Sequence, residues 1–181
     1  MEAARTGHSL HGTLAEVLGV GVLLVGSSGI GKSETALELI QRGHRLVADD
    51  VVELSRDRDR LMGESPELIR HHLEIRGIGI LYVPDLYGRQ AVRDRWRVEL
   101  ECRLEPWVAG REYERIGMER PTRTLEGVEV PSLLLPVRPA GSMATLVEVA
   151  VRDHLQRSIG VVAASRLDRR VRGRATPESV E

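Results

Sequence analysis

The sequence predicts an α/β fold in which a glycine-rich turn joins a strand to a helix. Its 181 residues, 41% of them apolar, fit one domain with a sizeable core. Apolar runs of strand length alternate along the chain with segments of helical periodicity. The clearest unit is GVLLVGSSGIGKSETALELI, residues 21–40, an apolar run followed by a glycine-rich turn and a helical pattern. Together these features indicate a single α/β domain.

The first half of the chain supplies the elements around this turn. The segment GTLAEVLGVGVLLVG predicts two short strands with a break near Gly19. SETALELIQRG predicts a helix with one apolar face, and Gly43 fits its C-cap. HRLVADDVVEL predicts a strand, an acidic corner and another strand, and RDRDR is expected to be a solvated turn.

The second half is less regular. SPELIRHHLEIRG predicts a short helix or turn at Ser65 and Pro66, and GIGILYVPDLYG predicts an apolar strand that enters a loop. QAVRDRWRVELECRLEP predicts one half-buried strand, and REYERIGMERPTRTLEGVEVP is expected to be irregular. SLLLPVRPAGS predicts a strand ending in a loop, and MATLVEVAVRDHLQRSIG an amphipathic helix. We therefore assign residues 1–160 to the domain and 161–181 to an Arg-rich tail, helical at first and then frayed.

Composition narrows the classes of function. The net charge of −1 gives no case for binding nucleic acid or an anionic membrane. The single cysteine, Cys102, excludes an intramolecular disulfide and suits a reducing compartment. No apolar run approaches the length of a membrane span, and the first residues lack the apolar region of a signal peptide. We therefore expect a cytoplasmic protein.

Residues 26–33, here called the glycine-rich loop, match the phosphate-binding P-loop motif G-x-x-x-x-G-K-[ST]. Glycines let backbone N–H groups turn toward phosphate oxygens, and the following helix adds its N-terminal dipole. Lys32 is the only lysine among the 26 Lys and Arg residues and would reach the outer phosphates, while Ser33 would bind Mg²⁺. The alternative, a glycine-rich turn with a chance Lys-Ser pair, does not explain why the flanking strand and helix also fit. The phosphate-binding residues are then Gly26, Ser27, Ser28, Gly29, Ile30, Gly31, Lys32 and Ser33.

Two further patches bear on the fate of the terminal phosphate, because ATPases, GTPases and several kinases share this loop. Asp49-Asp50 ends a predicted strand, so one carboxylate can bind a metal ion or take a proton from an acceptor hydroxyl. An ordinary Asp-Asp turn is the alternative. Glu74 and Arg76 occupy alternate positions of LEIRGIGIL and would lie on one strand face, as a metal ligand and a phosphate-neutralising group or as a surface ion pair.

Taken together, these patches resemble the C-terminal catalytic domain of the HPr kinase/phosphorylase family. The resemblance runs from about Ser9 to Gly160. The matching segments are LHG (10–12), residues 19–54, LEIRGIGIL (73–81), EYERIG (112–117) and LPVRPAGSMATLVEVA (135–150).

The resemblance implies a bacterial, Mg²⁺-dependent serine/threonine-protein kinase of carbohydrate regulation. Such enzymes phosphorylate a serine of the phosphocarrier HPr with ATP or pyrophosphate. They also remove that phosphate with inorganic phosphate and release pyrophosphate. The implied fold is a mixed sheet with flanking helices, like the nucleotide-binding core of phosphoenolpyruvate carboxykinase, and the implied assembly is a homo-hexamer. A counterpart of the family's N-terminal domain is absent from the sequence, and Ser27 stands where the family has an acid.

The family's functional residues transfer position by position. The resemblance makes His11, Lys32, Asp50 and Arg115 catalytic, with Asp50 as the base of phosphorylation and the acid of the reverse reaction. Ser33 and Glu74 match Mg²⁺ ligands, Asp49 lies beside the acceptor site, and Arg76 belongs to the same signature as Glu74. Without the family, His11 would be taken for an ordinary loop or core histidine. The segment tied to the reverse reaction comprises Pro136, Val137, Arg138, Pro139, Ala140 and Gly141.

Two alternatives of other classes remain at this point. One is a kinase of the same fold that acts on a different acceptor, suggested by the missing N-terminal domain and by RPAGS (138–142) where the family usually has RPGRN. The other is a nucleotide-binding sensor in which ATP changes assembly or partner binding without transfer.

Overall fold

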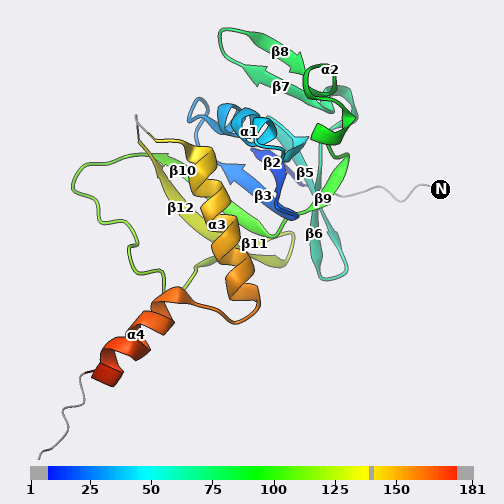
Figure 1. The fold of residues 1–181 in the computed structure, drawn as a ribbon. Coiled ribbons are helices and arrows are strands. Elements are labelled where there is room, and N and C mark those ends of the chain that lie inside the picture. The colour runs from blue at the N-terminus through cyan, green and yellow to red at the C-terminus, as the bar shows by residue number, and fades with distance from the viewer. Residues whose placement is uncertain (1–7, 139–140, 175–181) are drawn as a thin grey trace, which may run out of the picture.

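The computed structural model describes residues 8–138 and 141–174, and a six-stranded mixed sheet in the order β11-β12-β10-β3-β2-β4 forms its centre (Figure 1). Its strands are β2 (Thr13–Val17), β3 (Val20–Val25), β4 (Arg45–Ala48), β10 (Leu100–Pro106), β11 (Thr122–Leu125) and β12 (Val128–Val137). β10 runs parallel to β3 and β12, and β2 is antiparallel to both β3 and β4. Consequently β3, β4, β10 and β12 all end at the same edge of the sheet.

Each face of the central sheet is covered by a different layer. Helices α1 (Lys32–Gln41) and α3 (Met143–Ser158) cover one face (Figure 1). A second sheet covers the other, and its antiparallel strands are β1 (His8–His11), β5 (Val51–Asp57), β6 (Arg60–Glu64) and β9 (Arg95–Arg97). Alternate residues of β3 pack on opposite faces of the central sheet: Leu24 packs against the helices and Leu23 against the second sheet. Burial on both faces explains why the sequence of β3 is apolar throughout.

A hairpin packs on the outer side of α1. It consists of β7 (His72–Ile75) and β8 (Gly79–Tyr82), with α2 (Val83–Tyr87) and the 3₁₀ turns η1 (Glu67–Ile69) and η2 (Arg89–Ala91) beside it. Leu73 and Ile75 of the hairpin join Ala36 and Ile40 of α1 in one buried cluster. This packing places the start of α1 beside the turn that follows β7 (Figure 1).

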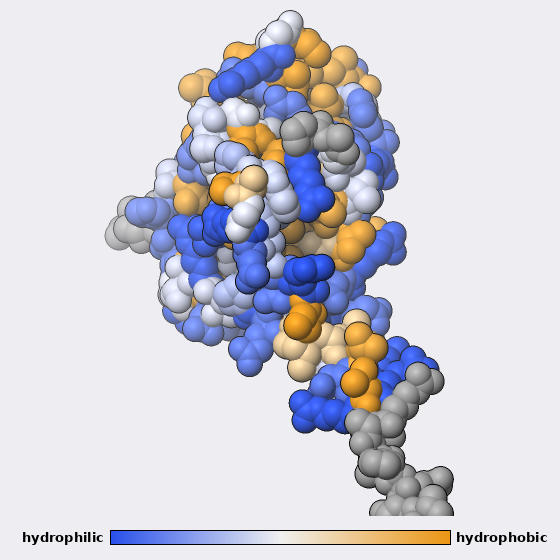
Figure 2. Space-filling view, turned by 90° about the vertical axis from the view of Figure 1, so that its left-hand side faces the viewer, coloured by the Kyte–Doolittle hydropathy of each residue, from blue (hydrophilic) through white to orange (hydrophobic). Residues whose placement is uncertain are grey.

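The last helix, α4 (Ala163–Arg174), extends away from the body of the molecule (Figure 1). Its Leu167 and Val171 are 64% and 59% exposed, and apolar side chains lie between charged ones there (Figure 2). Helix α4 takes up much of the predicted Arg-rich tail, and residues 175–181 lie outside the described residues. No helix in the described ranges is long and apolar enough to cross a membrane.

The strand–turn–helix unit, the acidic corner between two strands and the amphipathic helix α3 confirm the sequence predictions. Three expectations were wrong. The loop expected after β8 is the helix α2, which Pro84 helps to start. The one strand expected over residues 90–106 is two strands in different sheets, β9 and β10. The irregular segment 111–131 ends in a β11–β12 hairpin, whose two-residue turn puts Glu126 and Gly127 at positive φ.

Candidate functional site

Most of the predicted site residues gather where β3 and β4 end, at an edge of the sheet where ligand sites usually lie in open α/β folds. The glycine-rich loop follows β3, and Asp49-Asp50 follows β4. Between them is a small cavity of about 80 Å³, here called the polar cavity. It is lined by His11, Ser28, Gly29, Gly31, Lys32, Ser33, Glu34, Asp49, Asp50, Glu74 and Arg76.

Two glycines of the loop combine a positive φ with a close neighbour, which is backbone at Gly26 and a flexible side chain at Gly29. Gly26 has φ 151°, and a Cβ there would lie 2.5 Å from the carbonyl oxygen of Leu104 in β10. Gly29 has φ 78°, and a Cβ there would lie 2.7 Å from the guanidinium of Arg76. The loop therefore packs closely against both β10 and Arg76, as its sequence requires.

Lys32 begins α1 and turns its side chain back into the loop. Its ammonium donates hydrogen bonds to the carbonyl oxygens of Gly26 at 3.0 Å and Ser27 at 3.1 Å. The residue is 6% exposed, and this burial lowers the pKa of Lys32, while the nearby Asp49 and Asp50 carboxylates oppose the shift. The ammonium is thus held beside the backbone that would cradle phosphates.

Asp49 is the most heavily hydrogen-bonded carboxylate of the polar cavity. Thr13 Oγ1 donates to it at 2.6 Å, Ser33 Oγ lies 3.0 and 2.9 Å from its two oxygens, and the Glu74 N–H donates at 3.4 Å. Asp49 is 5% exposed. Burial raises the pKa of Asp49, and the hydrogen bonds from Thr13 and Ser33 oppose that rise. Its carboxylate is fixed in place by donors from three separate elements of the chain.

Asp50, in contrast, lies open at the mouth of the polar cavity, with its side chain 64% exposed. Its φ of 65° is in the left-handed region, which is uncommon for a residue other than glycine. His11 Nδ1 lies 2.9 Å from the Asp50 carbonyl oxygen and 3.1 Å from its carboxylate oxygen Oδ1. The structure therefore joins these two predicted catalytic residues, with the Asp50 carboxylate accessible to a molecule from solvent.

Glu74 and Arg76 both line the polar cavity, although only Glu74 is in β7. Arg76 lies in the turn after the strand, so the expected single strand face does not hold both residues. The Arg76 guanidinium donates to Ser28 Oγ of the glycine-rich loop at 3.3 Å. A cation thus lies beside the backbone N–H groups of the loop.

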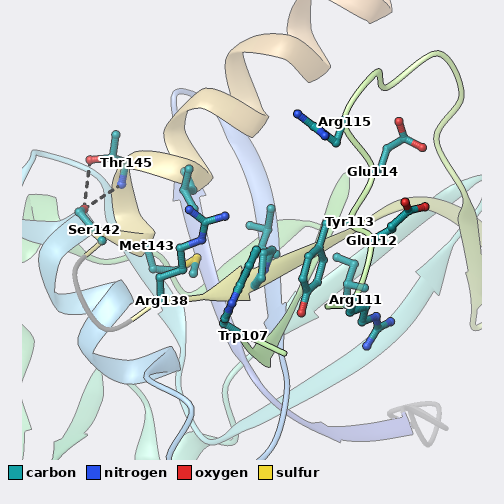
Figure 3. A pocket seen from close by; sticks show the side chains of 15 residues that line it. Trp107, Arg111, Glu112, Tyr113, Glu114, Arg115, Arg138, Ser142, Met143 and Thr145 are labelled. Atoms are coloured by element: carbon teal, nitrogen blue, oxygen red, sulfur yellow. Dashed lines mark hydrogen bonds between the residues drawn. The ribbon is translucent and has the colours of Figure 1, made fainter. Parts of the chain in front are cut away.

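Arg115 and the segment 136–141 lie elsewhere. Arg115, Pro136, Arg138 and Gly141 line a second, larger cavity of about 960 Å³, here called the aromatic cavity (Figure 3). Val137 ends β12, and Pro139 and Ala140 are outside the described residues. The structure does not bring Arg115 to the polar cavity.

Sequence reasoning missed several residues of this region. Thr13 is fully buried and bonded to Asp49, and its only sign in the sequence is a hydroxyl inside an apolar strand pattern. Glu34, at the start of α1, lines the polar cavity. Trp107 and Tyr113 form a stacked pair in the aromatic cavity; Tyr113 belongs to the matching segment EYERIG, but neither ring was predicted to be a site residue.

The fold and the site define an α/β domain with a mixed sheet, flanking helices and a polar cavity at the carboxyl ends of its parallel strands. The chain belongs to the family described as HPr Serine kinase C-terminal domain, whose model matches residues 3–171.

Similar proteins agree with that family. The HPr kinase/phosphorylase of Thermoanaerobacter sp. (strain X514) is 51% identical over 164 residues, covering 90% of this chain and 54% of the relative. That of Bacillus subtilis (strain 168) is 48% identical over 157 residues, covering 86% and 51%. The solved Hpr(Ser) kinase/phosphatase from Coxiella burnetii matches with a TM-score of 0.78 and 34% identity, covering 84% of this chain and 93% of that one. The chain spans about half the length of the curated relatives it matches.

Proposed function

We propose that this chain is the catalytic part of an HPr serine kinase, which transfers the terminal phosphate of ATP to a serine hydroxyl of the phosphocarrier HPr. The observation that carries the proposal is the position of Asp50: its exposed carboxylate, in contact with His11, lies at the mouth of a cavity lined by Lys32 and Ser33. Membership of the family supports HPr as the acceptor, since the relatives are HPr kinase/phosphorylases.

Different groups of the polar cavity bind the phosphates, neutralise their charge and accept the proton of the acceptor. Backbone N–H groups of the glycine-rich loop and the N-terminus of α1 bind the phosphates, as in a P-loop nucleotide-binding domain. Lys32 neutralises phosphate charge once its ammonium leaves the Gly26 and Ser27 carbonyls. Asp50 accepts the proton of the serine hydroxyl as the serine oxygen bonds to the terminal phosphorus of ATP. The bond between that phosphorus and ADP, the leaving group, breaks in the same step.

The oxygen donors of the polar cavity fit Mg²⁺. In the described part of the chain, no group of three or more His, Cys, Asp and Glu side chains is placed to hold a metal ion by itself. Mg²⁺ sites in phosphotransferases need only one or two carboxylates, because phosphates and waters complete the octahedron. Ser33 and Asp49 are already in contact, and Glu74 lines the same cavity. When bound there, Mg²⁺ would neutralise charge on the phosphates.

The same constellation supports the reverse reaction. Inorganic phosphate attacks the phosphoserine phosphorus, the bond from that phosphorus to the serine oxygen breaks, and a proton held on the Asp50 carboxyl returns to the serine oxygen as pyrophosphate leaves. This direction, the use of pyrophosphate as a donor and the role of residues 136–141 are part of the proposal. We further propose that the core resembles that of phosphoenolpyruvate carboxykinase and that the protein assembles as a hexamer. It would act in the cytoplasm, in the regulation of carbohydrate metabolism.

A transfer assay tests this function. The protein is incubated with ATP, Mg²⁺ and HPr, and the expected product is HPr with one phosphoserine, identified by mass spectrometry. Phosphoserine-HPr with inorganic phosphate should give HPr and pyrophosphate. Folded protein that binds ATP but leaves HPr unmodified would refute the acceptor. Transfer to a small hydroxyl compound instead would favour a kinase with another substrate, and binding without any transfer a nucleotide sensor.

A further inference from the structure

The polar cavity is too small for a whole nucleotide. At about 80 Å³ it has room for phosphate oxygens and an ion, whereas sites for drug-sized ligands generally measure about 300–1,000 Å³. The aromatic cavity, at about 960 Å³, is within that range. The nucleoside part of a donor held at the glycine-rich loop therefore needs space outside the polar cavity, and the aromatic cavity is large enough to supply it.

The aromatic cavity lies along the sheet edge in the direction opposite to the acidic corner. The strand order is β12-β10-β3-β2-β4, so Asp49-Asp50 after β4 lies on one side of the loop after β3. Trp107 and Arg138, which follow β10 and β12, lie on the other side. A linear phosphate chain that crosses the loop with its terminal phosphorus at Asp50 therefore points its other end toward the aromatic cavity.

The distance between the two sites is short. β10 is the direct neighbour of β3, and the start of the loop touches it at the Leu104 carbonyl. β12 is the next strand, about 10 Å from β3 at the usual strand spacing. Leu134, Leu135 and Pro136 of β12 line the aromatic cavity. A nucleoside joined to phosphates at the loop can thus reach this wall.

The side chains of the aromatic cavity suit a flat heteroaromatic base. The rings of Trp107 and Tyr113 are stacked, with centroids 4.9 Å apart and planes inclined by 24°, and the Arg138 guanidinium lies 4.0 Å from the Trp107 ring centroid (Figure 3). Two hydrogen bonds hold this arrangement, from the backbone N–H of Trp107 to the Val137 carbonyl and from the backbone N–H of Val108 to Tyr113 Oη, both at 3.1 Å. The flat guanidinium shows that this face of Trp107 accepts a planar group, and the exposed Arg138 can yield it.

The charges at the cavity wall fit a phosphorylated nucleoside. Arg111, Arg115 and Arg138 line it together with Glu112 and Glu114. Arg111 is paired with Glu105, and Glu114 accepts the N–H groups of Ile116 and Gly117. The wall therefore mixes arginines with glutamates, and its guanidinium groups, that of Arg138 after β12 among them, can pair with an α-phosphate.

We propose that the aromatic cavity binds the purine nucleoside of the phosphate donor, with Trp107 as the stacking partner of the base. The inference rests on the proposed function in one respect, that the donor is a nucleotide held by the glycine-rich loop. Trp107 and residues 134–136 of β12 then determine which phosphate donor binds. Asp50 acts on the hydroxyl of the acceptor.

The test compares two donors that differ in the nucleoside. Binding of ATP and of pyrophosphate, each with Mg²⁺, is measured by calorimetry for the wild type and for Trp107→Ala. Loss of one base-stacking contact should weaken ATP binding about tenfold, while pyrophosphate affinity stays within about twofold. Trp107→Phe, which keeps an aromatic face, should recover most of the ATP affinity. Trp96→Ala, at the chain's other tryptophan, is the matched control and should alter neither donor.

A second variant covers the case in which Trp107→Ala does not fold. Leu146 lines the cavity from α3 and is 44% exposed, so Leu146→Trp should fill the cavity with little effect on the core. It should lower ATP affinity and spare pyrophosphate. Unchanged ATP affinity in the variants, equal losses for both donors, or a wild type that binds pyrophosphate but not ATP would overturn the inference. None of these measurements uses HPr, so failure of transfer to HPr would refute the proposed function and leave this result standing.

Discussion

Ser33 Oγ lies within hydrogen-bond distance of both carboxylate oxygens of Asp49, 3.0 and 2.9 Å away. This contact joins the first turn of α1 to the end of β4, two elements on opposite sides of the polar cavity. It places the Ser33 hydroxyl, one of the proposed Mg²⁺ ligands, beside the buried Asp49 carboxylate. Because Asp49 is buried, its protonation is coupled to the stability of the fold.

The first prediction concerns that coupling. Burial raises the pKa of Asp49 above its ordinary value of 3.8, so the folded protein holds this proton more tightly than the unfolded chain does. The resulting stabilisation is complete below the ordinary pKa and is lost as the pH rises through the raised value. The free energy of unfolding of Asp49→Asn should therefore increase relative to wild type as the pH rises from about 4 toward 7.

Urea unfolding without Mg²⁺ or phosphate across this pH range measures the effect. Asp57→Asn, at the exposed end of β5, is the control and should show no such trend. A difference between Asp49→Asn and wild type that stays flat or shrinks with pH would contradict the prediction.

A second prediction concerns Thr13, the buried donor to Asp49. Thr13→Val keeps the shape of the side chain but removes its hydroxyl, so Asp49 loses a hydrogen bond of 2.6 Å. We expect a loss of about 1–3 kcal/mol in the free energy of unfolding, together with weaker binding of Mg²⁺-pyrophosphate. Chemical denaturation and calorimetry measure the two effects. Thr13→Ser restores the donor and should recover both; a Ser variant as impaired as the Val variant would point to packing instead.

The third prediction separates proton transfer from donor binding. Asp50→Asn preserves the shape of the side chain and tolerates the left-handed backbone at this position, but it cannot accept the serine proton. Transfer to HPr should fall by about 10²-fold or more, while ATP affinity stays within about twofold. Single-turnover transfer and equilibrium binding give the two values. Glu53→Gln, exposed on β5, is the control; an Asp50→Asn rate near wild type would remove Asp50 from the role of base.

The fourth prediction tests the contact between the loop and β10. In Gly26→Ala the new Cβ meets the Leu104 carbonyl oxygen at 2.5 Å, and φ is unfavourable for alanine. We expect destabilisation of about 2 kcal/mol or more. At Gly141, a Cβ has no neighbour within 4 Å, so Gly141→Ala should change stability little. Equal effects of the two substitutions in denaturant unfolding would show that the close approach does not matter.

Local sequence patterns predicted the parts of the fold that depend on local chemistry. The glycine-rich loop and the helix after it follow from the glycines and the apolar face, and both lie where they were expected. The pattern was insufficient where burial depends on distant segments. Glu101 is fully buried in β10 because Arg123 and Ser132 of the β11–β12 hairpin bond to its carboxylate, and no local alternation anticipates that.

The candidate site shows the same division. Lys32, Ser33 and Asp49 could be named because motif spacing and strand ends fix where they lie. Thr13 could not, since its partner is 36 positions away and its strand is otherwise apolar. Nor does a sequence indicate that Trp107, Tyr113 and Arg138 converge, because their contact depends on two strands lying side by side.

The position of Lys32 has a practical consequence for chemical labelling. It is the chain's single lysine, and its amine lies inside the glycine-rich loop. Reagents that acylate amines therefore have one side-chain target, while Cys102, buried and with its thiol pKa raised to about 12, offers thiol reagents almost nothing. Because Lys32 is 6% exposed and its amine is bonded to the Gly26 and Ser27 carbonyls, acylation at Lys32 reports how readily the loop releases that amine, without an added fluorophore.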